Sequence, residues 1–188
     1  MSDTSNKLGI VLCGGGVRGL AQIGVLAALE KHGISPGYIS GVSIGAVIGV
    51  FYAAGYTPEE MLEISKQGSL IRIFRLGIRK KGLSNLKYLH KMLKKHIKND
   101  SFEGLGKKLF VCASNLNTGK YDIFEKGELF RPVMASAAVP IIFQPQKIND
   151  QLYVDGGMLN NFPVEPLKEC CDKVIGVFVH NHDEVKTI

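Results

Sequence analysis

Tryptophan is absent from this sequence, and aromatic residues make up only 8% of its 188 positions. Because single-stranded nucleic acids bind on stacked aromatic side chains, we expect no nucleic-acid partner. Cysteine is scarce as well. The four cysteines show no Cys-x-x-Cys spacing, and Cys13 and Cys112 fall in apolar runs typical of buried strands. We therefore expect free thiols, no metal site and no cofactor.

Long apolar runs are also missing. No uninterrupted run reaches the roughly 18 residues that a membrane-spanning helix needs, and segment 1–7 is polar and unlike a signal peptide. We expect a cytoplasmic protein whose contact with a membrane, if it makes one, is peripheral. The length and the 45% hydrophobic content suit a single globular domain over 1–188, with its core at about 9–179.

Acidic residues are missing from segment 64–99, which holds 11 Lys or Arg, whereas the remainder of the chain carries 12 basic and 17 acidic residues. The excess positive charge is therefore local, in an insertion at about 66–98. Within it Ser84 is a suitable N-cap for a basic amphipathic helix. Its apolar positions are Leu86, Leu89, Leu93 and Ile97, and its polar side carries Lys87, Lys91, Lys94 and Lys95. Two roles stay open: a solvated surface helix, or contact with an anionic membrane.

Apolar runs and helical patterns alternate along the chain. The predicted strands lie at 8–13, 38–40, 108–114, 121–124, 152–155 and 173–179, and the predicted helices at 18–32, 44–54, from 57 onward and 129–138. Turn residues at 117–120 and 149–150 predict two hairpins. This alternation indicates an α/β fold of three layers, α/β/α, with a mostly parallel central sheet.

A candidate nucleophile lies in Gly41-Val42-Ser43-Ile44-Gly45, between the second strand and the following helix. A sharp strand-to-helix turn exposes a serine hydroxyl in a strained backbone conformation, and glycines on either side leave room for it. This pattern predicts a nucleophile elbow at Ser43.

A second glycine-rich turn, Gly14-Gly15-Gly16-Val17-Arg18-Gly19, follows the first strand. Its spacing also fits the dinucleotide-binding fingerprint, but no acidic residue ends the second strand to hold a ribose. The alternative is an oxyanion hole, in which exposed backbone N–H groups at a helix N-terminus stabilise negative charge. We favour the oxyanion hole.

A serine hydroxyl needs a base, and two candidates stay open on the residues alone. His180 and His182 follow the last strand, as in a Ser-His-Asp hydrolase. Asp155 in Asp155-Gly156-Gly157 ends another strand. A solvated aspartate with a pKa near 3.9 is a weak base, so in that role Asp155 must be buried enough to raise its pKa.

Four motifs in this order resemble the patatin-like phospholipases, particularly the short bacterial members. They are Gly14 to Gly19, Gly41 to Gly45, Ala135-Ser136-Ala137-Ala138-Val139-Pro140, and Asp155-Gly156-Gly157 with Asn161-Phe162-Pro163 after it. The resemblance spans about 9–179. It implies a patatin-like fold and a serine lipid acyl hydrolase, a phospholipase A, lysophospholipase or esterase, acting on phospholipid or another fatty acyl ester.

Residue by residue, the resemblance implies that Ser43 is the nucleophile and Asp155 its partner in a dyad. The N–H groups of the oxyanion hole would come from Gly14, Gly15, Gly16 and Ile44, with Arg18 nearby. Supporting glycines would be Gly41, Gly45, Gly156 and Gly157. Three alternatives stay open: acyl transfer at the same site, a Ser-His-Asp hydrolase using His180, and a lipid-binding module without catalysis.

Overall fold

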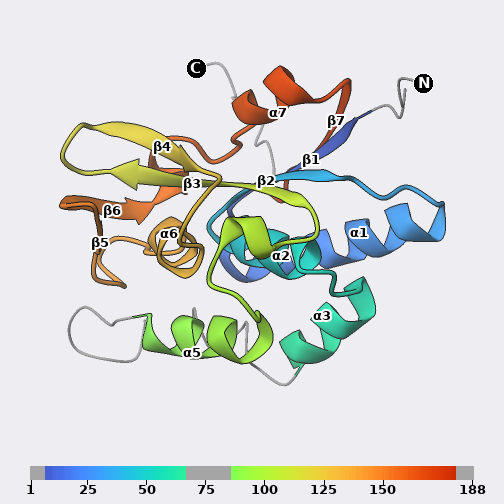
Figure 1. The fold of residues 1–188 in the computed structure, drawn as a ribbon, viewed down its shortest axis with the longest axis horizontal. Coiled ribbons are helices and arrows are strands. Elements are labelled where there is room, and N and C mark those ends of the chain that lie inside the picture. The colour runs from blue at the N-terminus through green and yellow to red at the C-terminus, as the bar shows by residue number, and fades with distance from the viewer. Residues whose placement is uncertain (1–6, 67–85, 181–188) are drawn as a thin grey trace, which may run out of the picture.

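The computed structural model describes residues 7–66 and 86–180, and a seven-stranded sheet forms its centre (Figure 1). The strands are β1 (Leu8–Leu12), β2 (Tyr38–Val42), β3 (Lys108–Asn115), β4 (Lys120–Phe124), β5 (Gln146–Ile148), β6 (Gln151–Asp155) and β7 (Lys173–Val177). Their order is β5-β6-β3-β2-β1-β7, and β4 also pairs with β3.

The sheet is mixed. Strands β7, β1, β2 and β3 are parallel, whereas β3 pairs antiparallel with β4 and β6, and β5 pairs antiparallel with β6. The two expected hairpins, β3–β4 and β5–β6, account for the antiparallel half, because a tight turn reverses the chain. Since parallel strands end at one edge of a sheet, the segments that follow β1 and β2 lie together.

Helices cover both faces of the sheet, as the three-layer fold class requires (Figure 1). In the view of Figure 1 α7 lies above the sheet, and the other labelled helices lie below it. Their bounds are α1 (Ala21–Lys31), α2 (Ile44–Ala53), α3 (Pro58–Lys66), α5 (Lys87–His96), α6 (Phe130–Ser136) and α7 (Glu165–Cys170). The sequence patterns did not predict α7, whose six residues are too few to show a helical period.

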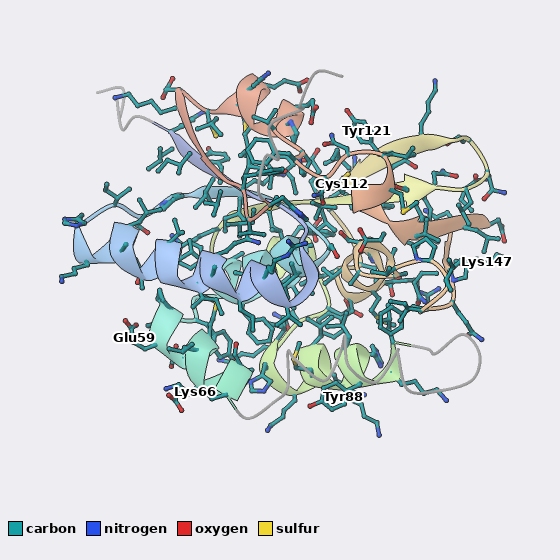
Figure 2. All side chains as sticks on the ribbon, turned by 180° about the vertical axis from the view of Figure 1, so that it is seen from behind. Glu59, Lys66, Tyr88, Cys112, Tyr121 and Lys147 are labelled. Atoms are coloured by element: carbon teal, nitrogen blue, oxygen red, sulfur yellow. The ribbon has the colours of Figure 1, made fainter. Side chains whose placement is uncertain are left out.

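The main core lies between the sheet and α1, α2, α3, α5 and α6, which all contribute buried side chains to it. All ten residues of α2 are buried, so this helix runs through the core instead of covering it. On the other face Leu167 of α7 packs with Val11 and Phe110. Figure 2 shows the side chains between these layers, with Glu59 and Lys147 at the periphery.

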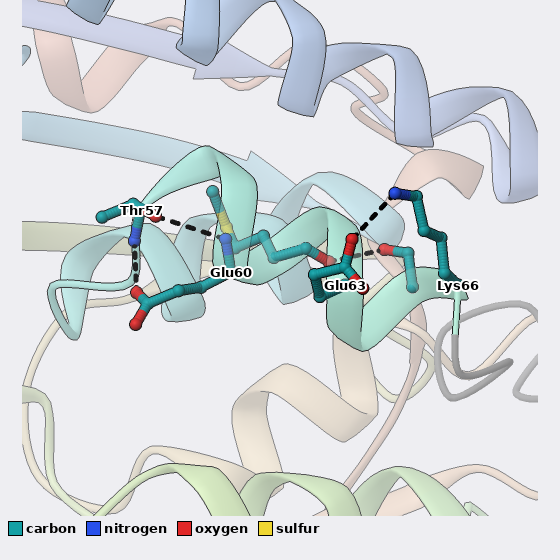
Figure 3. A network of polar contacts seen from close by, with 6 residues as sticks. Thr57, Glu60, Glu63 and Lys66 are labelled. Carbon is teal, nitrogen blue, oxygen red and sulfur yellow. Dashed lines mark hydrogen bonds and ion pairs between the residues drawn. The ribbon is translucent and has the colours of Figure 1, made fainter.

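Two helix starts differ in how they are built. The helix expected at 18–32 begins with a 3-10 turn, η1 (Gly16–Leu20), and α1 proper starts at Ala21. At α3, where a helix is predicted from 57 onward, Thr57 forms a reciprocal capping box (Figure 3): Thr57 N donates to Glu60 Oε2 at 2.9 Å, and Glu60 N donates to Thr57 Oγ1 at 3.2 Å. These two bonds satisfy backbone donors that a helix start leaves free.

Helix α5 has the predicted amphipathic character. Leu89, Met92 and Leu93 are buried, and the exposed lysines are Lys87, Lys91, Lys94 and Lys95. The proposed cap Ser84 and the basic residues at 72–81 lie outside the described residues. No described helix combines the length and the apolar character that crossing a bilayer requires.

Candidate active site

Ser43 occupies the turn between β2 and α2 with φ 56° and ψ −124°. A positive φ is rare and strained for a residue other than glycine, and such strain clusters at functional sites. The flanking glycines are required by space: a Cβ on Gly41 would lie 2.7 Å from Gly45 O, and a Cβ on Gly45 would collide with the Leu12 carbonyl. The turn therefore has the geometry of the predicted elbow.

The Ser43 hydroxyl contacts the carboxylate of Asp155, with Oγ donating to Oδ2 at 2.5 Å. Strand β3 explains how residues so far apart in sequence meet. Val42 of β2 pairs with Cys112, and Asp155 of β6 pairs with Ala113, so the two side chains leave strands on either side of β3. Both residues are buried, Ser43 being 4% exposed and Asp155 6%.

Burial raises the pKa of Asp155 to about 6, against the opposing effect of two hydrogen bonds that it accepts. These come from the Ser43 hydroxyl and from Gly157 N, which lies 2.8 Å from Oδ1. The raised pKa agrees with what a carboxylate base requires. Asp155 is therefore ionised at neutral pH yet holds a proton more tightly than a solvated aspartate.

Ser136 has a place in this site that sequence patterns did not assign. It is fully buried in α6, and its Oγ accepts a hydrogen bond from Ser43 N at 2.9 Å. Two residues on, Ala138 O accepts from Asp155 N at 2.9 Å. The segment that begins with Ser136 thus ties both members of the pair together, and its place in the 135–140 motif was the signal available in the sequence.

The glycine loop lies directly beside Ser43. A Cβ built on Gly14 would be 3.3 Å from Ser43 Cβ. Among the described residues, no acceptor receives the backbone N–H of Gly14, Gly15, Gly16 or Ile44. Unused donors at a strand-to-helix turn suit an anion, and the N-terminus of α2 adds a favourable dipole.

His180 does not contact the serine. Its Nε2 lies 2.9 Å from Gly14 O and 3.3 Å from Asn161 Nδ2, and no hydrogen bond joins it to Ser43 or Asp155. The Ser43 hydroxyl instead donates its hydrogen bond to the carboxylate of Asp155. His182, the other imidazole considered, lies outside the described residues.

The remaining candidates differ in exposure and packing. Arg18 is exposed in η1 and forms no ion pair with a described acid. Gly156 packs so closely on the Cys112 carbonyl that a Cβ has no room there. Large apolar side chains are exposed within three residues of Gly16, Ala138 or Gly157: Val17 (47%), Ile141 (91%), Met158 (61%) and Leu159 (50%).

The fold places the chain among α/β proteins with an elbow-type serine, because Ser43 lies on a strained strand-to-helix turn and contacts a buried carboxylate at the end of β6. The chain belongs to the patatin-like phospholipase family, whose family model matches residues 10–168. The resemblance found in the motifs is thereby confirmed.

The sequence is similar to several other proteins. The chain is 31% identical over 196 residues to an uncharacterized protein of Acanthamoeba polyphaga mimivirus, covering 93% of this chain and 66% of that protein. It is 30% identical over 178 residues to lysophospholipase NTE1 of Candida albicans, covering 88% of this chain and 12% of the relative. The chain thus spans only part of the length of these relatives.

Among solved structures, VipD from Legionella pneumophila has a similar fold. The superposition has a TM-score of 0.58 at 17% sequence identity, and it covers 84% of this chain and 47% of VipD. At this identity the likeness concerns the fold alone.

Replacing Asp155 by Asn is expected to stabilise the protein at pH 8. The pKa of Asp155 is about 6 in the folded chain against an ordinary value of 3.8. Its contribution to stability is therefore complete below 3.8 and is lost as the pH rises through 6. Above that pH the buried charge costs at most about 3 kcal/mol, at 1.36 kcal/mol per pKa unit.

Urea unfolding at pH 8 and pH 4.5 measures this effect, with the exposed Asp150→Asn as the matched control. We expect Asp155→Asn to raise the free energy of unfolding by about 1 to 3 kcal/mol at pH 8 and by much less at pH 4.5. Equal changes at both pH values would contradict a raised pKa.

Proposed function

We propose that the chain is a serine hydrolase of fatty acyl esters in lipids, acting through an acyl-enzyme on Ser43. The observation that carries this proposal is the 2.5 Å hydrogen bond from Ser43 Oγ to Asp155 Oδ2. A hydroxyl becomes a nucleophile when a base within hydrogen-bond reach takes its proton, and here the base in reach is a buried carboxylate with a raised pKa.

In the first half of the proposed reaction, Asp155 takes the Ser43 proton while Oγ attacks the ester carbonyl carbon. The carbonyl electron pair moves to oxygen and forms an oxyanion, which the N–H groups of Gly14 to Gly16 and Ile44 stabilise. When the intermediate collapses, the bond to the leaving alkoxide breaks, and that oxygen receives the proton from Asp155. Ser43 now carries the fatty acyl group as an ester.

In the second half, water replaces Ser43 as the nucleophile. Asp155 takes a proton from water as its oxygen attacks the acyl carbon, and the same N–H groups receive the oxyanion again. Collapse breaks the bond to Ser43 Oγ, and the proton on Asp155 passes to it. The products are a fatty acid and the free enzyme, with every proton returned.

Two observations support a lipid substrate. The apolar side chains of Val17, Ile141, Met158 and Leu159 are exposed within three residues of Gly16, Ala138 or Gly157, and exposed apolar side chains suit an acyl chain better than a polar substrate. Relatives in two fungi are named lysophospholipases. We assign Arg18, whose side chain is exposed beside the glycine loop, to a lipid phosphate.

Contact with an anionic membrane through α5 is part of the proposal. Lys87, Lys91, Lys94 and Lys95 are exposed on a helix whose opposite side is buried in the core. Each lysine near an anionic surface contributes about 1 kcal/mol of attraction.

Ser43→Ala and Asp155→Asn are each expected to lower kcat/KM for p-nitrophenyl butyrate by at least about 1000-fold, because one removes the nucleophile and the other the base. A fluorophosphonate probe should label the natural chain and fail to label Ser43→Ala. Ser35→Ala and Asp150→Asn, at exposed positions, serve as controls and should keep activity. Substantial hydrolysis by Ser43→Ala would refute the proposed nucleophile.

The pH dependence of kcat/KM reports on the base. Since Asp155 acts as a carboxylate and its pKa is about 6, activity should fall about tenfold per pH unit below that value. Hydrolysis measured from pH 4.5 to 8 at constant ionic strength tests this. A rate that stays flat down to pH 5 points to a base with an ordinary carboxyl pKa and contradicts the assignment.

Sedimentation with vesicles tests the role of α5. A triple variant, Lys91→Glu, Lys94→Glu and Lys95→Glu, should bind phosphatidylserine-containing vesicles at least about tenfold more weakly, and added salt should weaken binding by the natural chain. The matched control moves the same charge change to other exposed lysines: Lys120→Glu, Lys168→Glu and Lys173→Glu. An equal loss in both triple variants would show an effect of net charge alone.

A further inference from the structure

We propose that His180 is a positioning residue whose ring N–H fixes the peptide between Gly14 and Gly15, so that the Gly15 N–H faces the developing oxyanion. This inference deepens the proposed hydrolase function and rests on it. It concerns an imidazole that the sequence offered as a base and that the structure places against the glycine loop.

The end of β7 and the residues after it run alongside Cys13 and Gly14 and contact them at three points. Cys13 N donates to Val177 O at 3.3 Å, and Val179 N donates to Cys13 Sγ at 3.3 Å. His180 Nε2 then lies 2.9 Å from Gly14 O. The position of the imidazole is therefore set by backbone pairing that begins in the sheet.

The direction of the third contact follows from its chemistry. A backbone carbonyl has no hydrogen to give, so the hydrogen lies on Nε2, and His180 donates to Gly14 O. Asn161 Nδ2 lies 3.3 Å from the same nitrogen. The shorter of the two contacts is the one to Gly14 O.

Holding the carbonyl of Gly14 also sets the N–H of Gly15. In a trans peptide these two groups point in opposite directions, so a carbonyl turned to His180 turns the N–H of Gly15 the other way. No described residue accepts that N–H. Three consecutive glycines have little intrinsic preference for one orientation, because glycine reaches both signs of φ.

The preceding peptide is held in the same manner. Gln22 of α1 is fully buried, and its Nε2 donates to Cys13 O at 2.9 Å. The side chains of Gln22 and His180 therefore hold the successive carbonyls of Cys13 and Gly14. His180 is partly exposed, so it is the member that can be replaced without opening the core.

The test compares His180→Phe, which keeps a ring but loses the donor, with His180→Gln, whose amide N–H can reach the same carbonyl. His32→Phe is the matched control, because His32 is exposed at the far end of α1. Each variant is assayed for kcat and KM with p-nitrophenyl butyrate, for thermal midpoint, and for amide hydrogen exchange in segment 13–17.

We expect His180→Phe to lower kcat by about 10- to 100-fold, since full removal of one oxyanion donor costs about 100- to 1000-fold. KM and the thermal midpoint should change little, and amide exchange in segment 13–17 should quicken by about tenfold. His180→Gln should stay within about threefold of the natural chain in kcat, because it restores the donor. His32→Phe should match the natural chain.

Two results would overturn the inference. One is a His180→Phe variant with unchanged kcat and unchanged exchange. The other is a His180→Gln variant as slow as His180→Phe, which would mean that a hydrogen-bond donor at this position does not restore the rate. Failure of the proposed function would give a different result, because hydrolysis by the unmodified protein would then not depend on Ser43. Amide hydrogen exchange in segment 13–17 would still report whether His180 orders the loop.

Discussion

The hydrogen bond from Ser43 to Asp155 depends on where β3 lies. Strand β3 pairs with β2 on one side and with β6 on the other, and these registers bring the ends of both neighbours to one point. The end of α6 and the residues after it also fix the arrangement, because Ser136 accepts a hydrogen bond from Ser43 N and Ala138 O accepts one from Asp155 N. A shift of one residue in either register would turn a side chain to the other face of the sheet. The pair therefore exists only while the whole mixed sheet holds its register.

This arrangement lowers the stability of the fold. The positive φ at Ser43 costs on the order of 1 to 3 kcal/mol, and the buried carboxylate adds a cost that its raised pKa reflects. The helix that starts at Ser43 offsets them, because every residue of α2 is buried and each large aliphatic side chain contributes about 1.5 to 3 kcal/mol. The strained residue thus opens the most deeply buried helix that the structure describes. The core holds the elbow in a conformation that Ser43 alone would not adopt.

Local patterns in the sequence were enough for some features and not for others. The glycines around Ser43 predicted the turn, and the pattern from 57 onward predicted a helix start, since both depend on neighbours a few residues away. The parallel strands and the two hairpins were predicted, but the pairing of β6 with β3 was not. That pairing joins segments far apart in the sequence, and local patterns carry no information about it. That Asp155 lies close to Ser43 was predicted from the order of the motifs, because the periodicity of apolar residues says nothing about this pair. The contacts of Ser136 and His180 escaped prediction because they join residues 93 and 166 positions apart.

Charge movement explains why the glycine loop matters so much in the proposed reaction. Before attack the negative charge sits on Asp155, and after attack Asp155 is neutral and the oxyanion carries the charge. The net charge of this buried site stays the same, but its position moves toward the loop. The hydrogen bonds from Ser43 and Gly157 favour the charge at the start, so N–H groups already oriented at the destination must favour it at the end. In the role that we propose for it, His180 contributes to the rate by holding the loop and takes no proton, which distinguishes it from the base.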